Sequence, residues 1–257
     1  MSARPSTLLL GALLYGSLQA HAIPLAPQIE GMFLGGDGAH SSWVQVDDGW
    51  RGTLQGHETW GTGIWGLADQ DAVMNLTAGD PAVVRTLSTH VAHINFADQR
   101  FIDDWGAAWS NPTLAPPFNG DPTASQDNWA SRFWGYIAIT APGYYNFGVL
   151  YDDGFRFSLF GADSASLSIG IDGLNPRDRL GFTEDLLLDT GLYGFRLDAY
   201  ERLEAGAVQL AWYTPGTNDW SVVPQSHLFT SAIPEPSAAA LMLAGLGLLA
   251  LRARPRG

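Results

Sequence analysis

The residues best suited to binding chemistry in this sequence are two adjacent aspartates, Asp152 and Asp153, which end an alternating apolar run and precede Gly154. Neighbouring carboxylates repel each other unless a cation or an arginine lies between them. Calcium is the natural cation for such a pair, because it is a hard ion that takes roughly 6 to 8 oxygen ligands. The alternative is a plain turn in which the aspartates only cap the backbone.

Acidic residues elsewhere could in principle do catalysis. Glu201 and Glu204 could act as the acid and the nucleophile of a retaining glycosidase, whose carboxyl groups lie about 5 Å apart. Acids spaced in this way around a β-turn are more often simply solvated. The sequence contains no Gly-x-Ser-x-Gly, His-Glu-x-x-His or phosphate-loop motif. We therefore expect a binding protein rather than an enzyme.

Period-two alternation of apolar and polar residues predicts antiparallel strands in the middle of the chain. The alternation begins at Ser131, is interrupted at Pro142-Gly143 and at the aspartate pair, and returns over residues 192–200 and 207–213. Residues 91–96 form a further candidate strand, and residues 67–76 form the only plausible helix of any size. This pattern predicts an all-β fold, an antiparallel β-barrel or sandwich.

Composition restricts the possible partners. The 257 residues include 13 basic residues, all arginine, and 26 acidic ones, so the net charge is −13. An acidic surface makes nucleic acid an unlikely partner. The apolar share of 46% and the ten tryptophans exclude a disordered chain. Cysteine is absent, which rules out disulfides and thiolate chemistry.

The tryptophans are more numerous than one core needs as filler, and aromatic faces stack on sugar rings. Trp134 and Trp212 lie in alternating runs, and we predict that both belong to the core.

The N-terminus has the pattern of a secretory signal peptide. Residues 1–22 contain Arg4, an apolar stretch over residues 8–18, and then the small residues Ala20 and Ala22 around His21. This order predicts export and cleavage after Ala22.

The C-terminus has a second, more specific pattern. Pro234, Glu235 and Pro236 precede an uncharged apolar run over residues 238–251, and three arginines follow within residues 252–257. As a helix this run would be about 21 Å long, against a hydrocarbon core of about 30 Å. Its arginines would stay on the cytoplasmic side, which places the preceding chain outside.

This order of parts resembles the PEP-CTERM sorting signal of Gram-negative bacteria that make extracellular polysaccharide. The resemblance implies that an exosortase, a transpeptidase, cuts near the tripeptide. It further implies an inner-membrane intermediate, held transiently by the C-terminal helix, and then a place on the cell surface or in the extracellular matrix.

The middle of the chain resembles the protective-antigen-type β-barrel domain, which also occurs in flocculin adhesins and in glycosidases. Six short motifs over residues 63–229 carry the resemblance, together with a closing segment at residues 223–228. The motifs are Ile94-Asn95-Phe96 with Trp105-Gly106, residues 127–136, residues 142–147, residues 152–157, residues 189–193 and residues 210–216.

In the flocculin-like lectins, the aspartate doublet that corresponds to Asp152 and Asp153 holds a calcium ion that also binds sugar hydroxyls. A second loop there supplies an asparagine, and Asn218 is the matching candidate, with Asp219 as an extra carboxylate and Trp220 as a sugar-stacking residue. The sequence departs from those lectins after the doublet, where Gly154 and Phe155 resemble the toxin and glycosidase modules instead.

Together these features predict four segments: a signal peptide (1–22), a Gly-rich extension (23–62), the β-domain (63–229) and the sorting signal (230–257). The predicted function is a surface-sorted, calcium-dependent binding module for polysaccharide or glycan. A glycan-active hydrolase and a structural matrix protein without a small ligand are the alternatives.

Overall fold

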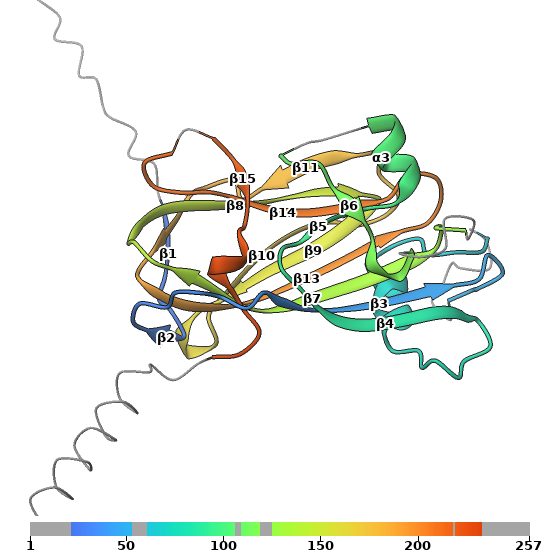
Figure 1. Ribbon diagram of the computed structural model, residues 1–257, viewed down its shortest axis with the longest axis horizontal. Helices are drawn as coiled ribbons and strands as arrows, with labels where there is room; N and C mark the ends of the chain where they lie inside the picture. Colours follow the sequence, from blue (N-terminus) through green and yellow to red (C-terminus); the bar gives the residue numbers. More distant parts are fainter. Residues whose placement is uncertain (1–21, 53–60, 106–108, 119–124, 218, 233–257) are drawn as a thin grey trace, which may run out of the picture.

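The computed structural model describes residues 22–52, 61–105, 109–118, 125–217 and 219–232. Within this part of the chain, two sheets stack face to face as a β-sandwich (Figure 1). The sandwich form of the sequence prediction is therefore confirmed, whereas these residues do not close into a barrel.

The first sheet has the order β1-β12-β8-β14-β5-β6, with β11 beside β8 and β15 beside β14. All its pairings are antiparallel except β1 with β12 and β5 with β6. Its strands are β1 (Ile23–Leu25), β12 (Leu186–Leu188), β8 (Gly143–Asp152), β14 (Ala207–Tyr213), β5 (Asn95–Ala97), β6 (Thr113–Leu114), β11 (Asp178–Gly181) and β15 (Ser221–Val222).

The second sheet has the order β10-β9-β13-β7-β3-β4, with β16 beside β7 and β2 beside β13, and it is antiparallel throughout. Its strands are β10 (Ser166–Ile171), β9 (Gly154–Phe160), β13 (Gly191–Glu201), β7 (Trp129–Ile139), β3 (Ala39–Val46), β4 (Val83–Val91), β16 (Leu228–Phe229) and β2 (Ile29–Glu30). Short 3₁₀ turns occur at Pro116–Phe118, Ala162–Ser164 and Gln225–His227.

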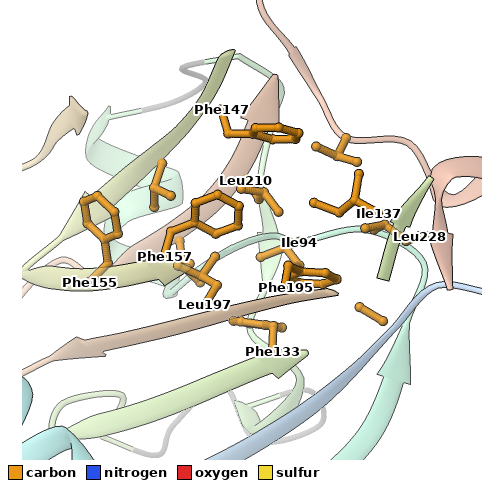
Figure 2. Packing of buried hydrophobic residues seen from close by; sticks show 14 of the residues in the cluster. Ile94, Phe133, Ile137, Phe147, Phe155, Phe157, Phe195, Leu197, Leu210 and Leu228 are labelled. Atoms are coloured by element: carbon orange, nitrogen blue, oxygen red, sulfur yellow. The ribbon is translucent and has the colours of Figure 1, made fainter. Parts of the chain in front are cut away.

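The core lies between the two sheets and is built from the inward positions of the alternating strands. Phe147 on β8 and Leu210 on β14 face Phe157 on β9 and Phe133 on β7, and all four are fully buried (Figure 2). The burial of these four side chains follows from the period-two alternation of the sequence, because successive side chains of a strand point to opposite faces. Trp212, 6% exposed, belongs to this core as predicted.

In the described part of the chain, two α-helices flank the sheets: α2 (Leu67–Met74) and α3 (Gln99–Trp105). The predicted helix over residues 67–76 is confirmed as α2, which ends two residues earlier. Asp172 caps it from another loop by accepting the backbone N–H of Leu67 at 2.7 Å. This carboxylate satisfies one of the amides that every helix N-terminus leaves open.

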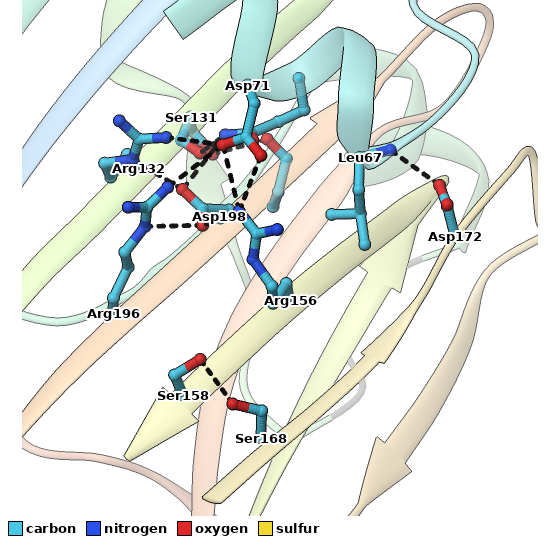
Figure 3. Close-up of polar contacts among 12 residues, drawn as sticks. Leu67, Asp71, Ser131, Arg132, Arg156, Ser158, Ser168, Asp172, Arg196 and Asp198 are labelled. Carbon is cyan, nitrogen blue, oxygen red and sulfur yellow. Dashed lines mark hydrogen bonds and ion pairs between the residues drawn. The ribbon is translucent and has the colours of Figure 1, made fainter. Parts of the chain in front are cut away.

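An arginine cluster joins α2 to the outer face of the second sheet (Figure 3). Asp198 on β13 is fully buried and accepts hydrogen bonds from Arg132, Arg156 and Arg196, at 2.7 to 3.0 Å. The same three guanidinium groups contact Asp71 of α2 at 3.1 to 3.2 Å. Burial opposes ionisation, but the bonds from Arg196 and Arg132 outweigh it and hold the pKa of Asp198 below its usual value.

Two local predictions were wrong. Trp134 is 37% exposed rather than part of the core, because its neighbour Phe133 takes the inward position on β7. Residues 91–96 do not form one strand: β4 ends at Val91 in the second sheet and β5 begins at Asn95 in the first. The residues between them carry the chain from one sheet to the other.

The described part of the segment 23–62 is built into the sandwich. β1 pairs with β12, β2 pairs with β13, and β3 lies between β7 and β4. The segment described from the sequence only as a Gly-rich extension therefore contributes three strands to the two sheets.

The signal-peptide residues 1–21 with Ala20, the sorting residues Pro234, Glu235 and Pro236, and the apolar run 238–251 lie outside the described residues. Within the described ranges, none of the helices has the length and apolar character needed to cross a bilayer.

Candidate functional site at the aspartate pair

The aspartate pair lies where the chain passes from one sheet to the other. β8 ends at Asp152 in the first sheet and β9 begins at Gly154 in the second, and the peptide bond between Asp152 and Asp153 is cis. Gly154 is buried, and a Cβ at this position would collide with the Tyr200 hydroxyl. That hydroxyl donates to the carbonyl of Gly173 at 2.6 Å, so one tyrosine packs under the doublet and holds the loop after β10.

Backbone amides from two loops hold the two carboxylates in place. The N–H of Arg202, in the loop between β13 and β14, donates to Oδ2 of Asp153 at 2.9 Å. In the loop between β10 and β11, the N–H of Asn175 donates to Asp153 and that of Arg177 donates to Asp152. The acids therefore do more than cap their own turn, because they join three separate segments.

The environment of the pair disfavours two negative charges. Burial, and then the neighbouring charge of Asp153, raises the pKa of Asp152 to about 8. Burial also raises the pKa of Asp153 to about 6, against the effect of the Arg202 and Asn175 amides. A cation between the carboxylates would relieve both effects, since an opposite charge favours the ionised form.

A cavity of about 410 Å³ opens at the pair. Its walls come from α3, from the loop after β10 and from the loop after β13. The lining residues are Arg100, Asp104, Asp152, Asp153, Leu174, Asn175, Pro176, Arg177, Leu203, Glu204 and Ala205. The doublet is thus accessible to a ligand.

This cavity supplies some, but not all, of the oxygen ligands that a hard cation needs. Among the described residues, no three acidic or histidine side chains form a metal-binding group by themselves. A calcium ion at Asp152 and Asp153 would therefore need further oxygens from backbone carbonyls, from water or from the side chain of Asn175. The amide nitrogen of Asn175 donates to the carbonyls of Asp172 and Gly173 at 3.0 and 3.2 Å, which leaves its Oδ1 as the acceptor.

Glu201 lies behind the doublet and cannot act on a substrate. It is fully buried, and neither carboxyl oxygen has a hydrogen-bond partner among the described residues. Burial, and then the charges of Asp98 and Asp127, raise its pKa well above the usual value. Glu204, by contrast, lines the cavity. The glycosidase pair considered from the sequence therefore has one member that no sugar can reach.

The structure places the predicted second loop far from the doublet. Strand β14 runs antiparallel to β8, with Ala207 opposite Asp152 and Tyr213 opposite Asn146. The residues that follow Tyr213, including Asp219 and Trp220, therefore lie at the other end of these strands. Trp220 is half-buried there and stacks on Trp109 at 5.6 Å between ring centroids. Asn218 lies outside the described residues.

The loops that do meet the doublet, residues 172–177 and 202–206, were missed in the sequence. A usable signal was present: Arg202 to Gly206 separates two alternating runs. If the second run pairs with the strand that ends at Asp152, this loop must lie beside the doublet. The sequence does not reveal that pairing, because it is non-local.

The C-terminal part of the chain matches a known sorting sequence. Residues 232–256 match the PEP-CTERM protein-sorting motif. The chain carries an exosortase sorting signal. The PEP-CTERM motif indicates export and sorting to the cell surface, as predicted. No curated protein sequence matches the chain.

The chain is similar to solved structures of adhesin domains. The A domain of epithelial adhesin 6 from Candida glabrata, solved with Galβ1-3GlcNAc, is 15% identical with a TM-score of 0.52, over 84% of this chain and 96% of that one. A PA14 sugar-binding domain from an RTX adhesin is 13% identical with a TM-score of 0.46, over 78% and 99% of the two chains.

A longer protein is also similar in part. An anti-sigma factor domain-containing protein from Clostridium clariflavum is 23% identical with a TM-score of 0.45, over 86% of this chain. This chain spans 52% of that protein. At these identities the likeness to the adhesin 6 domain shows the fold alone, and the protective-antigen-type family stays a prediction.

Proposed function

We propose that this protein is a surface-sorted glycan-binding module in which Asp152 and Asp153 hold a calcium ion that contacts the sugar. The observation that carries the proposal is the doublet itself. Two adjacent carboxylates border a cavity of about 410 Å³, and amides from two other loops fix them there. Arg177 and Arg202 offset only part of the burial and charge repulsion that raise the pKa values of the pair, so a bound cation would stabilise the ionised form further.

Different side chains and backbone amides of the chain would bind the calcium ion and orient its ligands. Asp152 and Asp153 would supply carboxylate ligands, and Asn175 Oδ1 would supply a neutral oxygen. The N–H groups of Arg202 and Asn175 would keep Asp153 oriented, so that little ordering is left to occur on binding. Calcium, when bound, would offer coordination positions in which sugar hydroxyls replace water.

Glycan as the ligand is supported by the shared fold and by the export signal. The adhesin 6 domain, which has this fold, was solved with a disaccharide, and we extend carbohydrate binding to this chain. The PEP-CTERM motif indicates sorting to the cell surface. We further propose that the apolar run 238–251 inserts transiently into the inner membrane before an exosortase removes it.

The test is binding of the full-length protein to a glycan array, in calcium and in EDTA, with two matched variants. Asp152→Asn removes one charge at the doublet. Asp163→Asn removes the same charge at an exposed position in the 3₁₀ turn after β9. We expect calcium-dependent glycan signals that Asp152→Asn abolishes and Asp163→Asn leaves intact. An array on which none of the glycan signals depends on calcium, or calcium-dependent signals that Asp152→Asn retains, would contradict the proposal.

A further inference from the structure

A second aromatic surface lies on the outer face of the second sheet, away from the doublet. Trp134 on β7 is 37% exposed, and His40 on β3 stacks on it with 5.1 Å between ring centroids and an interplanar angle of 16°. His40 is itself fixed by a hydrogen bond between Nε2 and the carbonyl of Thr230, at 3.0 Å. His90 packs edge-on against His40 at 4.6 Å. The exposed indole is therefore held in one orientation.

A cavity of about 430 Å³ adjoins this indole, within the range of roughly 300–1,000 Å³ for small-ligand sites. Its lining residues are Gln28, Trp134, Gly135, Tyr136, Phe160, Gly194, Phe195, Thr230, Ser231 and Ala232. Gly194 on β13 is paired directly with Tyr136 on β7 and with Phe160 on β9. A position without a side chain between two aromatic residues produces a trough in the sheet surface.

The chemistry of the lining selects the ligand. It offers aromatic rings together with the amide of Gln28 and the hydroxyls of Ser231 and Thr230, and it includes no charged residue. The Thr230 hydroxyl donates to Asp37 and can therefore only accept from a ligand. Oxygen Oε1 of Gln28 accepts the N–H of Gly194 at 3.2 Å, which anchors this amide beside the trough. Flat aromatic faces suit the apolar C–H faces of a pyranose ring, and amide and hydroxyl groups suit its hydroxyls.

We propose that this trough is a second carbohydrate site, which takes a neutral hexopyranose on Trp134 without calcium. It lies at the opposite end of β9 from the doublet: Gly154 begins the strand and Phe160 ends it at the trough. That separation is about 20 Å along the strand. Two sites on one domain could engage one polysaccharide at two points and raise its apparent affinity.

Fluorine NMR of the full-length protein labelled with 5-fluorotryptophan tests the site. The resonance that disappears in Trp134→Ala identifies this residue among the ten tryptophans. With cellohexaose added in EDTA to about 20 mM, enough to detect millimolar binding, we expect a saturable shift of this resonance. A resonance that does not move would overturn the proposal.

Matched variants separate this site from the doublet. Trp134→Ala should weaken cellohexaose binding at least about tenfold, and Trp134→Phe should weaken it less, because some ring face remains. Tyr144→Ala removes an aromatic side chain that is 54% exposed on β8. This variant should leave the affinity for cellohexaose unchanged. Asp152→Asn should leave this binding intact even if it abolishes calcium binding. Equal affinity in Trp134→Ala, or loss of binding in Asp152→Asn, would overturn the proposal.

Discussion

The backbone N–H of Arg202 donates to the carboxylate of Asp153 at 2.9 Å, across a sequence separation of 49 residues. This bond ties the loop between β13 and β14 to the junction of β8 and β9. At this junction the chain passes from the first sheet to the second. A ligand bound by Asp152 and Asp153 would therefore stabilise both sheets. Binding and folding should therefore be linked.

Calcium affinity should rise with pH between about 6 and 8. The pKa of Asp152 is raised to about 8 and that of Asp153 to about 6, so at lower pH a cation must displace protons from the pair. Calorimetric titrations of calcium at pH 6 and pH 8, in buffers of different ionisation enthalpy, would measure the proton release. Equal affinity at both pH values would show that the doublet is not the site.

The metal-free protein should lose stability as the pH rises from about 5 to 8. Asp152, Asp153 and Asp98, with folded pKa values of about 8, 6 and 6, hold protons there that the unfolded chain has already released. The folded state then binds more protons, and the free energy of unfolding falls with pH. We expect Tm in EDTA to fall by at least about 5 °C, since one pKa unit corresponds to about 1.4 kcal/mol and about 1 kcal/mol corresponds to 2–4 °C in a domain of this size.

Saturating calcium should flatten this pH dependence, because a cation replaces the protons. A Tm in EDTA that rises over the same interval would contradict the raised pKa values.

Replacing Glu201 by glutamine should remove part of the pH dependence at little cost in stability. Glu201 is fully buried and its pKa is raised well above the usual value, so the folded protein holds it as a neutral acid of similar shape to glutamine. Urea unfolding at pH 5 and pH 8 would measure the change. Loss of glycan binding in this variant, with the fold intact, would instead assign Glu201 a direct role.

Removing Asp198 should destabilise the domain by about 3 kcal/mol or more, because three arginines would lose their buried partner. Asp71→Ala should cost less, since that carboxylate is 42% exposed. Urea denaturation of both variants would test the order. An Asp198→Ala protein as stable as Asp71→Ala would show that α2 is held by other contacts.

The sequence predicted those parts of the fold that depend on local pattern. Alternation located β7, β8, β9, β13 and β14, because the inward residues of a half-buried strand must be apolar. The same alternation puts Phe133 and Trp134 on opposite faces of β7, but alternation alone does not say which face is inward. Trp134 was predicted for the core, whereas Phe133 is the buried residue and Trp134 is 37% exposed on the outer face.

The candidate site could be predicted only in part. The aspartate pair is recognisable in the sequence because two adjacent aspartates are unusual directly after the apolar run of a strand. Its partners Asn175 and Arg202 reach it through pairings between distant strands, and the antiparallel register of β8 with β14 is not encoded in any short motif. Asp219 and Trp220 looked plausible by spacing, and that register places them at the other end of the strands.

Isothermal titration of calcium into the protein, with Asp152→Asn and Asp163→Asn measured alongside, asks whether Asp152 and Asp153 bind the metal. We expect a saturable heat of binding near one calcium per chain at pH 8, lost in Asp152→Asn and retained in Asp163→Asn. Absence of heat in the wild type, or equal binding by the Asp152→Asn variant, would contradict calcium binding by this pair.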